Sequence, residues 1–260
     1  MKKFINVSAA NIYKRPNFRT EVKSQALLWE EVNLMEKQDS FSKIKTGNGY
    51  TGWINNHQLK DGAGYGLENK KMITSNYVII WQSPKSGSLP LRDASAGGYL
   101  IIKNEKDDML EVILPDGLCG WAGSECIEPL PELSRKNLTA YAHSMIGVPY
   151  SWGGKTPKGL DCSGFVQLVH KMFGVNIRRD SPMQFKDGTK VSDDPLDGQP
   201  GDLMFFAEDG EKITHVGFCL GDGKILHARG MVRINSLRTD AHDFDAQLLD
   251  TFVEIKTFLK

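Results

Sequence analysis

The sequence has no excess of either charge and no apolar run near the ~18 residues that a membrane span needs. Lysine plus arginine and aspartate plus glutamate number 32 each among 260 residues. This balance gives no reason to expect nucleic acid or a membrane surface as a partner. The N-terminal residues include lysines but neither the apolar core nor the cleavage site of a signal peptide. A cytoplasmic location is expected, or a periplasmic or extracellular one if an export signal was removed.

Cysteine is scarce as well. The four cysteines are Cys119, Cys126, Cys162 and Cys219. They form no Cys-x-x-Cys pair and are too few for a disulfide scaffold, so a reducing compartment is the simpler interpretation. No cysteine and histidine have the spacing of a structural zinc site. We therefore expect no metal and no cofactor.

The first 130 residues differ in pattern from the rest. Short β-rich runs alternate there with turn residues and predict strands at 26–35, 41–46, 77–81, 99–102 and 109–114. A weak repeat is also present, because GYTGW at 49–53 returns as GLCGW about 68 residues later, at 117–121. The repeat predicts two small all-β barrels, residues 1–62 and 63–130.

The remaining part, residues 131–260, follows a proline-rich linker and mixes helices with strands. One helix is predicted from Ser134 to Gly147, and a second begins near Cys162. Predicted strands follow at 202–206, 214–220, 224–228 and 252–258. Helices followed by an antiparallel run of strands give an α+β domain.

Cys162 lies at the predicted start of the second of these helices. Asp161 is a good N-cap, and the apolar spacing that follows ends at Gly174. A thiol in the first turn meets unpaired backbone N–H groups and the positive end of the helix dipole, which favour the thiolate. The alternative is a buried, inert cysteine.

Two histidines lie further along, in a predicted hairpin. A turn at Gly221–Gly223 would place position 220 opposite 224, and therefore Gly217 opposite His227. His215 and His227 would then be diagonal neighbours on one face, about 7–8 Å apart. Such a pair suits a proton relay in which one ring orients the other. A metal pair and two unrelated surface histidines are the alternatives.

Three segments in order resemble the signatures of the NlpC-type cysteine peptidases: LDCSGF at 160–165, THVG at 214–217 and ILHA at 225–228. PYSWGG at 149–154 and PGDL at 200–203 are also similar to family segments. The GYTGW and GLCGW segments resemble bacterial SH3-like domains. The resemblance implies an α+β papain-like peptidase domain, with helices packed on an antiparallel sheet, preceded by two small all-β SH3-like barrels.

By this resemblance, Cys162 would be the nucleophile, His215 the general base and His227 the residue that orients it. Tyr150 matches a family tyrosine near the nucleophile, as part of the oxyanion pocket or simply as an aromatic wall. The resemblance also implies substrate contacts for Asp161, Ser163 and Trp152.

Residues 178–184, RRDSPMQ, have two interpretations. In the simpler one, Asp180 or Ser181 caps a short helix and Arg179 is solvated at the surface. The segment also resembles the branch of the family with two SH3-like domains, where Asp180 and Ser181 would hold the free α-amine of an N-terminal L-alanine. A carboxylate is the natural receptor for an ammonium group.

The same branch resemblance implies that the first SH3-like domain closes the substrate groove with Glu21 and Tyr50, although Glu30 and Glu31 compete for the role of Glu21. The expected activity is cleavage of the γ-D-glutamyl–L-diamino acid bond of murein peptides, releasing L-Ala-D-Glu in cell-wall peptide recycling. The diamino acid, meso-diaminopimelate or L-lysine, stays open. Alternatives are an endopeptidase or amidase acting on intact peptidoglycan, or a non-catalytic wall-binding protein. The sequence does not indicate the oligomeric state and is compatible with a monomer.

Overall fold

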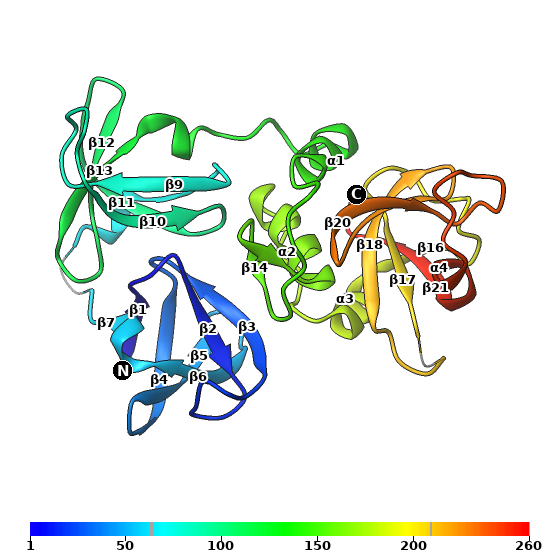
Figure 1. The fold of residues 1–260 in the computed structure, drawn as a ribbon, viewed down its shortest axis with the longest axis horizontal. Helices are drawn as coiled ribbons and strands as arrows, with labels where there is room; N and C mark the ends of the chain where they lie inside the picture. The colour runs from blue at the N-terminus through cyan, green and yellow to red at the C-terminus, as the bar shows by residue number, and fades with distance from the viewer. Residues whose placement is uncertain (63–64, 209, 260) are drawn as a thin grey trace. The chain divides into compact units, whose positions relative to one another are not determined.

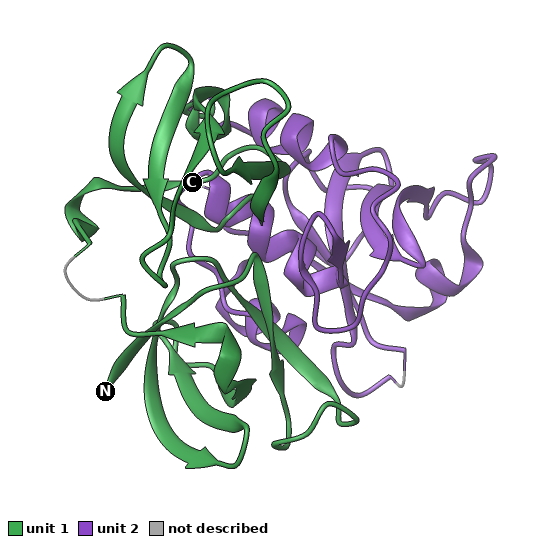
Figure 2. Cartoon of the chain, turned by 60° about the vertical axis from the view of Figure 1, so that its left-hand side comes forward, with its two compact units in different colours: residues 1–130 green, residues 131–260 purple. Residues whose placement is uncertain are grey.

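The computed structural model describes residues 1–62, 65–208 and 210–259, in two compact units, Met1–Leu130 and Pro131–Lys260 (Figures 1 and 2). None of the helices in these described ranges combines the length and apolar character that a membrane span requires. Among the described residues, the first unit contains two sheets and short 3-10 turns, and the second combines four α-helices with a six-stranded sheet and a two-stranded one.

The first sheet of unit 1 is antiparallel, with strand order β3-β2-β6-β5-β4-β1-β7. Its strands are β1 Lys2–Ile5, β2 Ala9–Tyr13, β3 Val22–Leu27, β4 Glu31–Gln38, β5 Phe41–Thr46, β6 Thr51–Asn55 and β7 Leu59–Lys60, with a 3-10 turn, η1, at Asn56–Gln58. Alternate residues of these strands bury an aliphatic core that includes Ile12, Ile44 and Ile54.

The second sheet repeats this arrangement with the order β10-β9-β13-β12-β11-β8. Its elements are η2 Leu67–Asn69, β8 Lys70–Met72, β9 Tyr77–Trp81, β10 Pro90–Ser95, β11 Tyr99–Lys106, β12 Met109–Ile113, β13 Cys119–Gly123 and η3 Ser124–Ile127. The two Gly-x-x-Gly-Trp segments end in equivalent strands, since Trp53 of β6 pairs with Tyr13 and Trp121 of β13 pairs with Trp81. The sequence repeat is thus a repeat of strand order.

The single strand predicted at 26–35 is wrong. The chain turns there between β3 and β4, with Trp29 at the positive φ of 61°. The apolar run that suggested a strand is instead a buried turn, in which the Trp29 indole donates to the Ile113 carbonyl at 3.0 Å. Periodicity did not distinguish the two because buried turns and buried strands are equally apolar.

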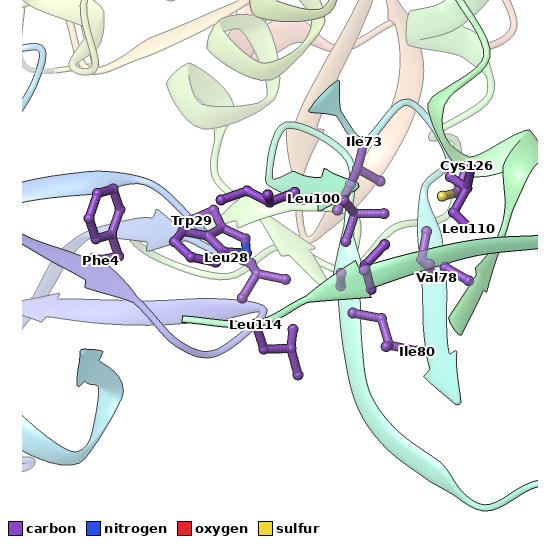
Figure 3. Packing of buried hydrophobic residues seen from close by; sticks show 14 residues of the cluster. Phe4, Leu28, Trp29, Ile73, Val78, Ile80, Leu100, Leu110, Leu114 and Cys126 are labelled. Atoms are coloured by element: carbon purple, nitrogen blue, oxygen red, sulfur yellow. The ribbon is translucent and has the colours of Figure 1, made fainter. Parts of the chain in front are cut away.

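A second hydrophobic core contains residues of both repeats of unit 1 (Figure 3). Phe4 of β1, together with Leu28 and Trp29 of the turn between β3 and β4, packs among the buried side chains of the second sheet. Next to this core, the Arg92 guanidinium binds the Asp116 carboxylate at 2.8 Å and the Asn6 carbonyl at 2.7 Å. Apolar packing and these polar contacts join both sheets into one folding unit.

Unit 2 is built on an antiparallel sheet with the order β16-β21-β17-β18-β19-β20. Its strands are β16 Thr189–Ser192, β17 Leu203–Phe206, β18 His215–Gly221, β19 Lys224–Arg229, β20 Met231–Ser236 and β21 Phe252–Thr257; β14 Lys155–Thr156 pairs separately with β15 Gly159–Leu160. The helices are α1 Arg135–His143, α2 Cys162–Met172, α3 Ser181–Asp187 and α4 Ala246–Thr251. Helix α2 contacts β18 and β19, which places its first turn beside the histidine hairpin.

The contact between α2 and β18 contains a buried histidine. The His170 ring stacks on Phe218 with centroids 5.4 Å apart, and its Nδ1 bonds the Val166 carbonyl at 2.9 Å. Its Nε2 is buried and has no hydrogen-bond partner among the described residues. Burial therefore lowers the pKa of His170 to about 4.

His170 should make the fold sensitive to acid. Because its folded pKa lies below the unfolded value, its contribution is complete above pH 6.5 and is lost as the pH falls toward 4. The difference corresponds to about 3 kcal/mol. We expect His170→Phe, measured by urea unfolding at pH 7 and pH 4.5, to reduce the loss of stability between these two pH values. An unchanged pH dependence would show that other groups control acid unfolding.

Candidate active site

The first turn of α2 is held by Asp161, as the sequence predicts. Its backbone is extended, with φ −90° and ψ 174°, and its side chain caps the helix by accepting from the Gly164 N–H at 2.6 Å. The second carboxylate oxygen accepts from the Gly153 N–H at 2.9 Å. Asp161 thus joins the loop before the helix to the helix itself, and Cys162 is the first helical residue.

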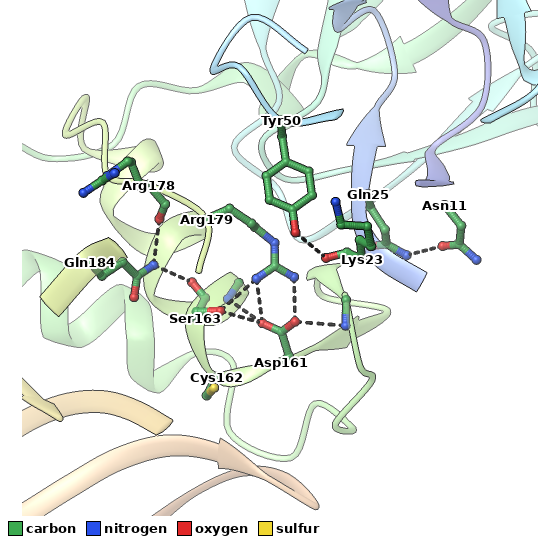
Figure 4. A network of polar contacts seen from close by, with 12 residues as sticks. Asn11, Lys23, Gln25, Tyr50, Asp161, Cys162, Ser163, Arg178, Arg179 and Gln184 are labelled. Carbon is green, nitrogen blue, oxygen red and sulfur yellow. Dashed lines mark hydrogen bonds and ion pairs between the residues drawn. The ribbon is translucent and has the colours of Figure 1, made fainter. Parts of the chain in front are cut away.

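Arg179 is not a solvated surface residue, contrary to the simpler interpretation of its segment. Its side chain is only 3% exposed and forms a two-pronged ion pair with Asp161, at 3.0 and 2.6 Å (Figure 4). One guanidinium nitrogen also donates to the Ser163 hydroxyl at 2.8 Å. In the sequence, Arg179 was noticeable only because it directly precedes the N-cap residue of a predicted helix. The sequence did not show that its ion-pair partner is the carboxylate of Asp161.

The segment after Arg179 is bound to the start of α2. The Gln184 amide donates to the Ser163 carbonyl at 3.1 Å and to the Arg178 carbonyl at 2.9 Å (Figure 4). Asp180 occupies the N-cap position of α3 without a capping side-chain bond, and Ser181 is the buried first residue of that helix. The contacts of Asp180, Ser181, Asp161 and Ser163 with substrate stay predictions.

The Cys162 thiol lies beside β18. Its sulfur is 3.9 Å from the Thr214 carbonyl oxygen. Burial, together with the Asp161 charge, raises the pKa of Cys162 to about 12, although the Ser163 and Val216 N–H groups favour the thiolate. The helix start favours the thiolate as expected, but burial has the larger effect on the pKa. A base that accepts the thiol proton would therefore promote its reaction.

The two predicted histidines do meet. Gly217 pairs with His227 as expected, although a bulge near the turn places Gly221, not Leu220, opposite Lys224. His215 Nε2 and His227 Nδ1 are 2.7 Å apart, and both rings are buried. Since Nε2 is used by His227, Nδ1 is the nitrogen of His215 that can take a proton from a thiol.

Both histidines are neutral near pH 7. Burial, followed by the charges of His227, Arg229 and Arg233, lowers the pKa of His215 well below its usual value. Burial also lowers the pKa of His227 to about 4, against a hydrogen bond to Asn235 at 3.0 Å that raises it.

Asn235 was missed in the sequence because β20 was not predicted. The alternation of Val232 and Ile234 after the turn at Gly230 was its only signal.

Gly217 leaves the space in which the histidine rings meet. A Cβ atom at this position would lie 2.7 Å from the His227 Cβ and 2.7 Å from the Ile225 Cδ1. We expect Gly217→Ala to displace β19, lengthen the contact between the rings, and lower kcat more than it raises KM. Steady-state kinetics would test this, with Gly47→Ala as a control, because a Cβ atom at Gly47 would have no atom within 4 Å and the backbone there has no positive φ. Unchanged kcat in the Gly217 variant would contradict it.

Tyr150 and Trp152 come from the loop before α2. The Tyr150 N–H donates to the Gly230 carbonyl at 2.9 Å, which ties this loop to the turn between β19 and β20. Burial raises the pKa of the Tyr150 hydroxyl, which therefore stays protonated and able to donate. Trp152 is 64% exposed.

Glu21 and Tyr50 belong to unit 1, where both lie near the start of β3. The exposed Glu21 carboxylate is 2.9 Å from the Lys14 ammonium. The Tyr50 hydroxyl donates to the Lys23 carbonyl at 3.2 Å, and the Lys23 ammonium lies 4.9 Å from the centre of the Tyr50 ring. Their contact with substrate stays a prediction.

No metal site accompanies these groups in the described ranges, where no three His, Cys, Asp or Glu side chains are arranged to hold an ion. The groups described at the site are a buried thiol, a hydrogen-bonded pair of neutral imidazoles and a protonated tyrosine. This combination can perform nucleophilic acyl transfer.

Comparisons with known proteins agree with this chemistry. Residues 147–245 match the NlpC/P60 family, and residues 12–59 match the bacterial dipeptidyl-peptidase Sh3 domain. The solved structure of an NlpC/P60 family protein from Bacillus cereus ATCC 10987 covers all of both chains, with a TM-score of 0.85 and 24% identity. That likeness supports the fold.

Two curated relatives extend over most of the chain. The γ-D-glutamyl-L-lysine dipeptidyl-peptidase of Bacillus cereus is 28% identical, covering 80% of this chain and 67% of the relative. Dipeptidyl-peptidase 6 of Lysinibacillus sphaericus is also 28% identical, covering 91% and 92%. The chain is accordingly a cysteine peptidase that combines an NlpC/P60 domain with a bacterial dipeptidyl-peptidase SH3 domain.

Proposed function

We propose that this peptidase cleaves the bond between γ-D-glutamate and an L-diamino acid in murein peptides with a free N-terminal L-alanine, releasing L-Ala-D-Glu. The observation that carries the proposal is the hydrogen-bonded His215–His227 pair on the strand beside which the Cys162 thiol lies. The relatives named as dipeptidyl-peptidases and γ-D-glutamyl-L-lysine dipeptidyl-peptidases support the choice of bond and product.

In the proposed reaction, His215 Nδ1 takes the Cys162 proton while the sulfur attacks the γ-carbonyl carbon. The charge that develops on the carbonyl oxygen is stabilised by the Cys162 N–H at the start of α2 and by the Tyr150 hydroxyl. The imidazolium then gives its proton to the leaving amine as the amide bond breaks. Water, deprotonated by His215, hydrolyses the thioester and restores the thiol.

Selection for a free N-terminus is assigned to Asp180 and Ser181 in unit 2 and to Glu21 and Tyr50 in unit 1. A carboxylate can bind the ammonium group of a free N-terminus. An N-acylated alanine has no such charge and would leave the carboxylate without a partner. Intact peptidoglycan, in which this alanine is acylated, would then be a poor substrate. The proposal includes a second SH3-like barrel at 63–130, which the matching strand order supports. It also includes a cytoplasmic location, which would suit the recycling of murein peptides.

The test compares four peptides by mass spectrometry of their products. L-Ala-γ-D-Glu-meso-diaminopimelate and L-Ala-γ-D-Glu-L-Lys are each paired with an N-acetylated twin, and Cys162→Ala is the control enzyme. Release of L-Ala-D-Glu from free peptides only, lost in the variant, is the expected result, and the relative rates identify the diamino acid. Equal cleavage of acetylated twins would indicate a wall-remodelling endopeptidase. Cleavage of none would favour the amidase or wall-binding alternatives.

A further inference from the structure

We propose that Asn235 is a positioning residue that fixes the ring tautomers of both histidines, so that His215 presents an unprotonated Nδ1 to the thiol. Asn235 lies on β20, opposite Ile225 and therefore diagonal to His227 across the β19–β20 pair. It extends the histidine pair to a chain of three hydrogen-bonded side chains. The inference concerns the base of the proposed reaction and rests on the proposed function.

The orientation of the Asn235 amide follows from its second contact. Its nitrogen, Nδ2, lies 3.3 Å from the Asp243 main-chain carbonyl, which also accepts from the Ser236 N–H at 2.9 Å. A carbonyl oxygen can only accept, so it requires the amide NH₂ on its side. The Asn235 Oδ1 is thereby directed to His227 Nε2, 3.0 Å away.

The proton positions then follow one after another. Oδ1 can only accept, so His227 must donate from Nε2, and its Nδ1 in the neutral ring is an acceptor. His215 must therefore donate from Nε2 to His227 Nδ1 across 2.7 Å. In the neutral His215 ring this leaves the lone pair on Nδ1, the nitrogen that must take the thiol proton. A main-chain carbonyl thus determines, through three side chains, which nitrogen is the base.

Without the amide oxygen, this order has no anchor. His227 could then carry its proton on Nδ1 and would no longer accept a hydrogen bond from His215. His215 would in turn populate the tautomer protonated at Nδ1, in which Nδ1 cannot act as a base. The charges that face the two rings, Arg229 of β19, Arg233 of β20 and Asp245 before α4, act on the charged forms and do not choose between neutral tautomers. That choice depends on the donor and acceptor pattern.

The test replaces Asn235 in the full chain. Asn235→Ala should lower kcat by about 10- to 100-fold with little change in KM. Long-range ¹H–¹⁵N spectra of histidine-labelled protein without substrate should show a single tautomer for His215 and His227 in the wild type and a mixture in the variant. Because this readout needs no substrate, it fails or succeeds independently of the proposed peptide specificity.

Two further variants separate positioning from folding. Asn235→Asp keeps an acceptor for His227 Nε2, so it should restore the tautomers in which both histidines are protonated at Nε2. Its carboxylate also favours the imidazolium form, which should move the acidic limb of kcat/KM to higher pH. Asp243→Ala keeps the main-chain carbonyl and should retain activity within about twofold. Wild-type tautomers and kcat in a folded Asn235→Ala protein would overturn the inference, as would equal loss in Asn235→Ala and Asn235→Asp.

Discussion

Replacing His215 by alanine is expected to lower kcat by at least about 10³-fold. Burial holds the Cys162 pKa at about 12, so almost no thiolate exists at neutral pH without a base to receive the proton. The measurement is single-turnover cleavage of the free tripeptide, with His242→Ala, an exposed histidine, as the matched control. A loss below tenfold would mean that another group takes the thiol proton.

The pH dependence gives an independent check on this base. A histidine whose pKa is lowered stays unprotonated to more acidic pH, so the acidic limb of kcat/KM should lie well below 6.5. Alkylation of Cys162 should also slow in His215→Ala. Cys119 is exposed, so this labelling is best done in a Cys119→Ser background.

The second large effect is on stability. Arg179→Ala would leave the Asp161 carboxylate buried without its counter-charge, at a cost of about 3–5 kcal/mol in the free energy of unfolding. The neighbouring arginine provides the control, because Arg178 pairs with Asp187 at the surface, where the two side chains are 44% and 38% exposed. Arg178→Ala should therefore cost less than about 1 kcal/mol. Both values come from urea unfolding at pH 7.

A double variant tests the reason for that difference. Removing both charges, as Asp161→Asn with Arg179→Met, should recover part of the stability lost in Arg179→Ala, because no uncompensated charge remains. The amide oxygen of asparagine can still cap α2. If the double variant is less stable than Arg179→Ala alone, the ion pair itself, and not the cost of an unpaired charge, dominates.

Much of the site followed from local patterns. The cap at Asp161 and the pairing of Gly217 with His227 depend on turn and helix-start signals within a few residues, and the structure has both. Arg179 and Asn235 did not follow, because the carboxylate partner of Arg179 is 18 residues away and the strand that carries Asn235 was not predicted. The residues next to Arg179 in the sequence do not indicate that it is buried, and those next to Asn235 do not indicate the second contact of its amide. The effect of burial on the thiol pKa did not follow either, since burial depends on packing around the helix start.

The core shared by the two sheets of unit 1 limits how this chain can be rebuilt. Phe4, Leu28 and Trp29 complete the interior of the second sheet, so the second repeat does not carry a full core of its own, whereas the first repeat also has a separate aliphatic core. The packing of the second repeat therefore depends on residues of the first. A chimera that takes a single repeat from a relative would expose apolar surface, whereas a graft of residues 1–130 as a cassette preserves it.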